Sequence, residues 1–195
     1  MSKLLIETRL FEGRVNEDSS GRTIVKGILQ RAGAPNQNER VYQKGILMRE
    51  AKKYETLIKE RRALGELDHP ESSVINLKNV SHNVREIHWD GDDLMGTVEI
   101  LPTPSGNILK ELLKAGILLG ISSRGMGSVE TVNENGKEAQ EVQPDFELIA
   151  FDFVSNPSTH GAFMYPVNES VDKTQDRTCD KYCKVESIIN DIMRG

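Results

Sequence analysis

Short runs of apolar and β-branched residues, separated by segments rich in Gly, Pro, Asn and Asp, make up most of this chain. Such runs are typical of β-strands bounded by turns. The expected strands cover residues 4–11, 22–31, 74–101, 117–130 and 146–154. A polar turn at 90–93 divides the third run, and the composition predicts loops at 32–36 and 132–140.

Helical spacing is confined to a few segments. Apolar residues recur near this spacing between 43 and 61, with Lys and Glu between them: Ile46, Leu47, Ala51, Tyr54, Leu57 and Ile58. A second helix is expected over 107–115, opened by Pro104 and ended at Gly116, and a short amphipathic helix over 184–193. The pattern predicts an α+β fold with a β-rich core flanked by a few helices.

The length and charge of the chain limit the classes of protein to which it can belong. Its 195 residues suit one domain with a substantial core, and the composition turns polar near residue 168. We therefore expect a domain over 1–168 and a tail over 169–195 with a regulatory or scaffold-docking role. A net charge of −5 without a dominant Lys/Arg block argues against a specific nucleic-acid partner. No apolar run reaches membrane-spanning length, and charge interrupts the start too soon for a signal peptide, so we expect a cytoplasmic protein without a membrane partner.

Both cysteines, Cys179 and Cys183, fall in the tail. Their spacing would put two thiols on one helical face, but two thiols alone are an incomplete zinc site, and His160 is the only histidine near them in sequence. We expect free thiols, no metal and no cofactor.

Three short segments carry the groups of a nucleophilic active site. His69 lies between Gly65 and Pro70, the pair Ser122-Ser123 follows Gly120, and Asp152 interrupts an apolar run. A hydroxyl becomes a good nucleophile when an imidazole takes its proton and a carboxylate orients that imidazole. On a strand the two serines point to opposite faces, so only one of them can face the histidine.

Other residues compete for each role. His82 and His88 alternate in a strand-like stretch beside Trp89, and a histidine before a proline is often a satisfied loop residue. Serines in a Gly-rich hairpin can equally be turn residues. Three further carboxylates could orient a histidine: Glu66, Asp68 and Glu147. If buried, Asp152 must be paired or hydrogen-bonded, and His69 could satisfy it; on an edge strand it could instead face solvent.

The same segments resemble a known family. Residues 65–70 (Gly-Glu-Leu-Asp-His-Pro) and 122–128 (Ser-Ser-Arg-Gly-Met-Gly-Ser) are similar to the histidine and serine motifs of the prohead core proteases of T-even-type tailed phages. Residues 36–47 resemble their N-terminal signature, although Gln43 stands where a proline is common, and residues 152–158 resemble their closing strand. The blocks occur in family order over about residues 4–167, which is more specific than any single motif.

The resemblance implies an assemblin-like fold, related to herpesvirus maturation proteases, and a serine endopeptidase with His69, Ser122 and Asp152 as its catalytic residues. Ser122 best matches the family nucleophile, with Ser123 as the alternative. The phage pattern favours Asp152 over His160, which would match the second histidine of the herpesvirus enzymes. The segment around Arg124 and Gly125 would supply the oxyanion donors.

The resemblance also implies a place and substrates. The enzyme would act in the host cytoplasm, inside the immature capsid, on phage scaffold or core proteins and the major capsid protein, and it would self-associate. It would cut after glutamate two residues beyond an aliphatic residue. Such strings occur in the chain itself, at residues 5–7, 10–12, 58–60, 64–66 and 109–111. They suggest a self-cleaving zymogen. The rival interpretation is a non-enzymatic capsid scaffold of the same fold, whereas an unrelated esterase is disfavoured because Gly-x-Ser-x-Gly is absent.

Overall fold

The structure, a computed structural model, describes residues 3–11, 16–17, 21–36, 38–70, 72–117, 119–134, 137–155 and 164–166. Its largest sheet has, in spatial order, the strands β12 (Met164–Pro166), β3 (Thr23–Arg31), β7 (Asp93–Ile100), β6 (Val80–Asp90) and β5 (Leu64–Glu66), with β2 (Asn16–Glu17) also paired to β3. Neighbouring strands in this sheet run antiparallel, and the β2–β3, β5–β6 and β6–β7 pairs join strands that are consecutive in the chain.

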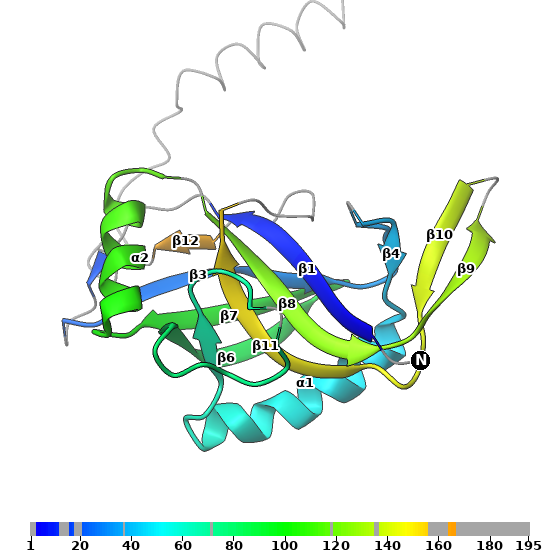
Figure 1. The fold of residues 1–195 in the computed structure, drawn as a ribbon, viewed down its shortest axis with the longest axis horizontal. Coiled ribbons are helices and arrows are strands. Elements are labelled where there is room, and N and C mark those ends of the chain that lie inside the picture. Colours follow the sequence, from blue (N-terminus) through cyan, green and yellow to red (C-terminus); the bar gives the residue numbers. More distant parts are fainter. Residues whose placement is uncertain are drawn as a thin grey trace, which may run out of the picture.

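A second sheet of three antiparallel strands lies across the first (Figure 1). Its order is β1 (Lys3–Phe11), β8 (Leu119–Gly127) and β11 (Glu147–Val154), so β8 is paired along both edges. Beyond the end of β5, Leu67 forms a parallel bridge with Phe153 of β11. The bridge joins the two sheets at the place where the His69 segment begins.

The remaining strands form a small ribbon at one end of the molecule (Figure 1). Its order is β4 (Arg40–Val41), β10 (Lys137–Val142) and β9 (Val129–Glu134). The rings of Tyr42 and Phe146 pack edge to face, with their centroids 5.2 Å apart, in a core cluster that also holds Leu5 and Val142 of β10. The cluster anchors the ribbon to the rest of the fold.

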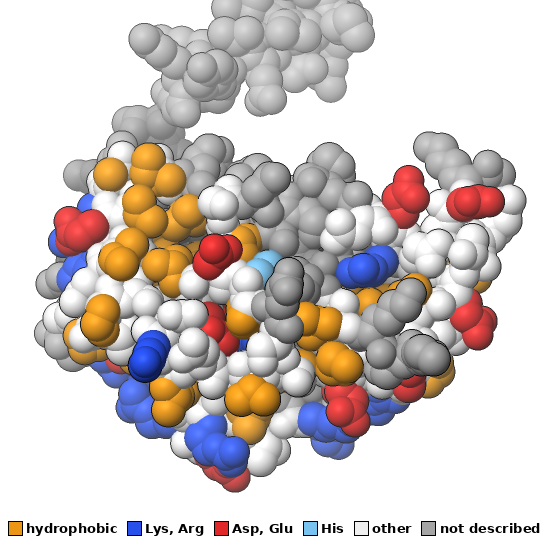
Figure 2. All heavy atoms as spheres, viewed as in Figure 1, with side chains coloured by type: hydrophobic (Ala, Val, Ile, Leu, Met, Phe, Trp, Pro, Cys, Tyr) orange, Lys and Arg blue, Asp and Glu red, His pale blue; other side chains and the backbone are white. Residues whose placement is uncertain are grey.

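Two helices flank the sheets in the described part of the chain: α1 (Lys44–Lys59) and α2 (Pro104–Lys114). Helix α2 begins where the Thr103 hydroxyl accepts a hydrogen bond from the Gly106 amide, and it ends before Gly116, whose φ of 76° suits glycine. Figure 2 shows hydrophobic side chains gathered over α2, where Ile108 is exposed. Neither helix is long and apolar enough to cross a membrane.

The main core fills the space between the two larger sheets. It receives Val25 and Leu29 from β3, Val98 from β7, and Ile121 and Phe151 from β8 and β11. These side chains are fully buried, so the two strands that carry Ser122 and Asp152 rest on a close-packed layer.

The observed elements confirm the predicted β-rich α+β class and most of the predicted segments. The predicted loop at 132–140 is wrong, because β9 and β10 form a hairpin there. The ribbon exposes Glu130, Thr131 and Asn133, so its polar composition resembles that of a loop. Residues 74–79 precede β6 instead of belonging to a strand, and the three-residue β5 was not predicted. The helix predicted over 184–193 lies outside the described residues.

Gly65 provides a test of this packing. A Cβ at this position would lie 2.0 Å from the Phe151 carbonyl oxygen and 2.2 Å from His82 Nε2, two groups that are themselves hydrogen-bonded. We expect Gly65→Ala to lower the free energy of unfolding by about 3 kcal/mol or more, measured by urea denaturation.

Gly45→Ala is the matched control, since Gly45 is an exposed helical residue with nothing within 4 Å of the added Cβ. We expect it to raise stability by about 0.5–1 kcal/mol. Equal effects of the two substitutions would contradict the packing described here.

Candidate active site

Ser122 and Asp152 are direct partners in the β8–β11 register, so their side chains share one face of the sheet. Arg124 lies two residues further along β8 and shares that face, whereas Ser123 points to the opposite one. The Ser123 hydroxyl is buried there and has no hydrogen-bond partner in the structure. The alternation of the strand therefore gives the two serines different surroundings.

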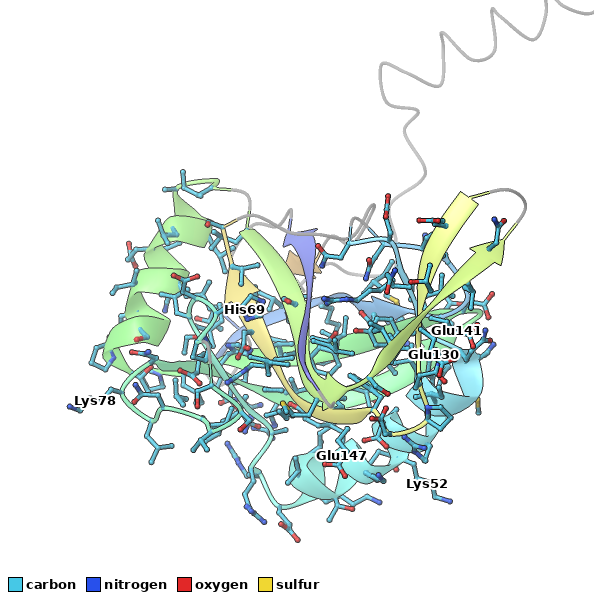
Figure 3. All side chains as sticks on the ribbon, turned by 45° about the vertical axis from the view of Figure 1, so that its right-hand side comes forward. Lys52, His69, Lys78, Glu130, Glu141 and Glu147 are labelled. Carbon is cyan, nitrogen blue, oxygen red and sulfur yellow. The ribbon has the colours of Figure 1, made fainter. Side chains whose placement is uncertain are left out.

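His69 reaches this face from the loop that follows β5 (Figure 3). The loop is fixed to β11, because the Asp68 amide donates to the Phe153 carbonyl oxygen at 2.7 Å. Asp68 has a φ of 72° and its carboxylate accepts from the His69 amide, so Asp68 forms the turn that aims the imidazole. His69 Nε2 lies 2.6 Å from Ser122 Oγ, and its side chain is 16% exposed.

The other imidazole nitrogen faces Asp152. His69 Nδ1 lies 3.3 Å from Asp152 Oδ2, which is ion-pair distance, but Nδ1 has no aligned hydrogen-bond acceptor. Catalytic hydrogen bonds are often long without substrate and tighten when it binds. The hydroxyl, imidazole and carboxylate thus follow one another in the order of a catalytic triad. The contact between imidazole and carboxylate is the longer of the two.

Asp152 is fully buried and is held mainly by other groups. Arg124 Nε donates to its Oδ2 at 2.8 Å, Arg124 Nη2 to its Oδ1 at 3.2 Å, and the Glu66 amide to its Oδ1 at 2.9 Å. Burial alone would raise the pKa of Asp152, but contacts with His69, Arg124 and the Glu66 amide outweigh it and lower the pKa. The carboxylate is therefore ionised where an imidazolium would need it.

Arg124 also binds beyond Asp152. Its Nη2 donates to Glu66 Oε1 at 3.0 Å and its Nη1 to the Ser72 carbonyl oxygen at 2.6 Å. Arg124, Glu66 and Asp152 have no exposed surface, so the guanidinium links β5, β8, β11 and the loop after His69 inside the protein.

Comparison with known proteins identifies the chain's relatives. The profile of the family described as "Prohead core protein serine protease" matches residues 3–172. The chain belongs to this family. Its sequence is 30% identical over 162 residues to the prohead core protein protease of Enterobacteria phage T4, covering 80% of this chain and 75% of that protein. Its fold is similar to the structure of the bacteriophage T4 capsid assembly protease, gp21, with a TM-score of 0.71, 29% identity, and coverage of 78% of this chain and 98% of that one.

Membership of the prohead core protease family confirms the resemblance found in the four sequence motifs. The similarity to the T4 structure also confirms the expected fold. Two of the motifs, at residues 65–70 and 122–128, come together in space, and the closing motif at 152–158 supplies Asp152 beside them.

The structure gives the competing residues other positions. His82 is buried with its Nε2 donating to the Phe151 carbonyl oxygen and its Nδ1 next to the Ser81 hydroxyl, whereas His88 is exposed. Glu147 is exposed at the start of β11. Asp152 does not face solvent, which excludes its assignment to an exposed strand face. His160, Cys179 and Cys183 lie outside the described residues.

Arg124 and Gly125 lie inside β8 and have register partners on β1 and β11, with a register shift in β11 between Leu148 and Ala150 opposite them. The Arg124 side chain holds Asp152. The oxyanion role expected of this segment stays a prediction. Sequence reasoning missed the Arg124–Glu66 pair, although two charged residues beside predicted site residues were a signal, because a buried charge needs a partner.

The pH dependence of stability tests whether His82 is buried and neutral in the layer behind the active site. Burial lowers the pKa of His82 from 6.5 to about 4, and nearby Asp152 offsets only part of this effect. The unfolded chain therefore binds more protons between these values, and folding loses stability as the pH falls from 6.5 to 4. We expect His82 to account for roughly 3 kcal/mol of that loss.

The measurement is urea denaturation between pH 4 and 7. His82→Gln should flatten the dependence of unfolding free energy on pH, whereas His88→Gln at an exposed position should keep it. A slope that is the same in wild type and His82→Gln would contradict the assignment of a neutral, buried His82.

Proposed function

We propose that this prohead core protease is a serine endopeptidase in which Ser122 is the nucleophile, His69 the general base and Asp152 the orienting carboxylate. The observation that carries the proposal is the 2.6 Å contact between His69 Nε2 and Ser122 Oγ, with ionised Asp152 behind the imidazole. Ser123 has no such partner, which supports Ser122 over its neighbour.

The chemistry follows from these positions. Asp152 holds the proton of neutral His69 on Nδ1, which leaves Nε2 free to accept the proton of Ser122 Oγ. The oxygen attacks the carbonyl carbon of the peptide bond and forms a tetrahedral intermediate, while the imidazolium is stabilised by Asp152. His69 then protonates the leaving amine, and in the second half it activates the water that releases the acyl group.

The relatives suggest the substrates. The T4 proteins are named as prohead core and capsid assembly proteases. We propose that this chain likewise acts inside the prohead in the host cell, on scaffold or core proteins and the major capsid protein, and that it cuts after glutamate. The division into a domain over 1–168 and a tail over 169–195, like self-association, belongs to this proposal.

Substitution of the two serines tests the nucleophile. We expect Ser122→Ala to lower cleavage of the cognate scaffold protein at least about a thousandfold, because the attacking oxygen is removed. Ser123→Ala removes a hydroxyl on the other face and should remain within a few fold of wild type. Cleavage positions are mapped by mass spectrometry.

Thermal unfolding of both variants is measured first, and a wild-type midpoint temperature shows that each variant is folded. Cleavage lost only in Ser123→Ala would overturn the assignment. Cleavage that persists in Ser122→Ala would remove the serine mechanism altogether, and a folded wild type that cuts nothing would favour the scaffold interpretation.

Self-cleavage is expected to follow the exposure of the glutamate strings. Glu66 is fully buried in β5, and Leu109 is buried in α2, so the strings 64–66 and 109–111 should stay intact in the folded protein. Leu5 is also buried and the string 5–7 pairs with β8, so this string should stay intact as well. Glu60 is exposed at the end of α1. We expect any cut to fall after position 12 or 60.

Intact-mass analysis of freshly purified protein measures this directly, with Ser122→Ala as the control that should keep its full mass. Identical fragments from wild type and Ser122→Ala would attribute them to another protease. A wild-type cut after Glu66 or Glu111 under native conditions would contradict the role of burial.

A further inference from the structure

The three charged side chains buried beside the site carry a net negative charge. Glu66, Arg124 and Asp152 are each 0% exposed, and they supply two carboxylates for one guanidinium. Buried ions are costly unless paired, so an unmatched charge in such a cluster calls for a physical reason.

Arg124 and His69 compete for the same oxygen. Asp152 Oδ2 accepts from Arg124 Nε at 2.8 Å and lies 3.3 Å from His69 Nδ1. An arginine paired with Asp152 alone would neutralise its charge and leave little attraction for an imidazolium. A second carboxylate on the guanidinium removes this effect, and Glu66 is in contact with Nη2 at 3.0 Å.

We propose that Glu66 is a positioning residue that neutralises Arg124, so that Asp152 keeps its negative charge for His69. The inference rests on the proposed serine mechanism and adds a fourth residue to it. Glu66 acts through Arg124 and Asp152, not on the substrate.

The hydrogen bonds of Glu66 support a role for its charge. Its Oε1 accepts from Arg124 Nη2 and from the Asn76 amide at 3.0 Å, whereas its Oε2 is buried without a partner. A neutral side chain with one acceptor oxygen would make both observed bonds. The second oxygen adds a desolvated lone pair and a negative charge, and only the charge is useful to the cluster.

Apart from Glu66 and Asp152, the described titratable side chains around this cluster do not balance the positive charge of Arg124. The described side chains that face the cluster or the imidazole, from helix, strands and loop, are Tyr54, Glu66, Asp68, His69, His82, Ser122, Arg124 and Asp152. Burial raises the pKa of Tyr54 and lowers that of His82, so both are neutral at pH 7. Asp68 is exposed and screened by solvent.

The test is an NMR titration of the His69 Cε1–H signal, assigned by its absence in a His69→Asn spectrum. All variants carry Ser122→Ala, so the result does not depend on activity. We expect Glu66→Gln to move the His69 titration midpoint to lower pH by about one unit, because one buried negative charge near the imidazole is removed. Glu66→Asp keeps the charge and should stay near the parent value.

Glu50→Gln is the matched control, because Glu50 is also a buried acid but binds Arg49, Lys53 and the Leu148 amide. It should leave the midpoint unchanged. A folded Glu66→Gln protein with the parent midpoint would overturn the proposal, as would an equal shift in Glu50→Gln.

A double substitution covers the case in which Glu66→Gln fails to fold. Glu66→Gln with Arg124→Gln removes one charge of each sign and keeps the net charge of the cluster. Arg124 lies nearer to His69 than Glu66 does, so we expect Arg124→Gln alone to move the midpoint upward and the double substitution to move it upward by less. A double substitution with the midpoint of Arg124→Gln or above would overturn the proposal, as would a downward shift in Arg124→Gln alone. The role of Ser122 is tested separately by scaffold cleavage, so failure of that mechanism and failure of this inference are distinguishable.

Discussion

The site depends on one buried guanidinium. Arg124 has no exposed surface and is held by carboxylates from two other strands and by a backbone carbonyl of the loop after His69. Removing one partner of a buried charge cluster typically costs 3–5 kcal/mol, since the remaining ions stay desolvated. Strands β5, β8 and β11 are therefore tied together at the level of the Ser122 hydroxyl, and this constraint places the imidazole.

Strand pairing supplies the rest of the geometry. Because Ser122 and Asp152 are register partners, a shift of one residue between β8 and β11 would move Ser123 onto the site face. The bridge from Leu67 to Phe153 brings the histidine segment to the same point. A close-packed layer beneath these strands, which includes Phe151 and His82, resists such a shift.

Much of this could be predicted from local sequence pattern. Long strands, both helices and the Gly116 end of α2 are local features, and they occur close to the predicted positions, whereas the Thr103 cap of α2 was not predicted. The β9–β10 ribbon was mistaken for a loop because most of its residues are polar, and Glu130, Thr131 and Asn133 are exposed. Strand β5 is too short to give an apolar signal. Alternation alone could not choose between Ser122 and Ser123, since that choice requires the register with β11. The pairing of Arg124 with Glu66 spans 58 residues in the chain and has no local signature.

The most direct test of the central claim is covalent labelling of the folded protein with a fluorophosphonate, followed by peptide mapping. An activated serine oxygen attacks the phosphorus and fluoride leaves, so the reagent needs no knowledge of the natural substrate. The account predicts a stable phosphonyl adduct on Ser122 that is lost in His69→Gln. An adduct on Ser123, or a folded protein that does not react at all, would contradict it.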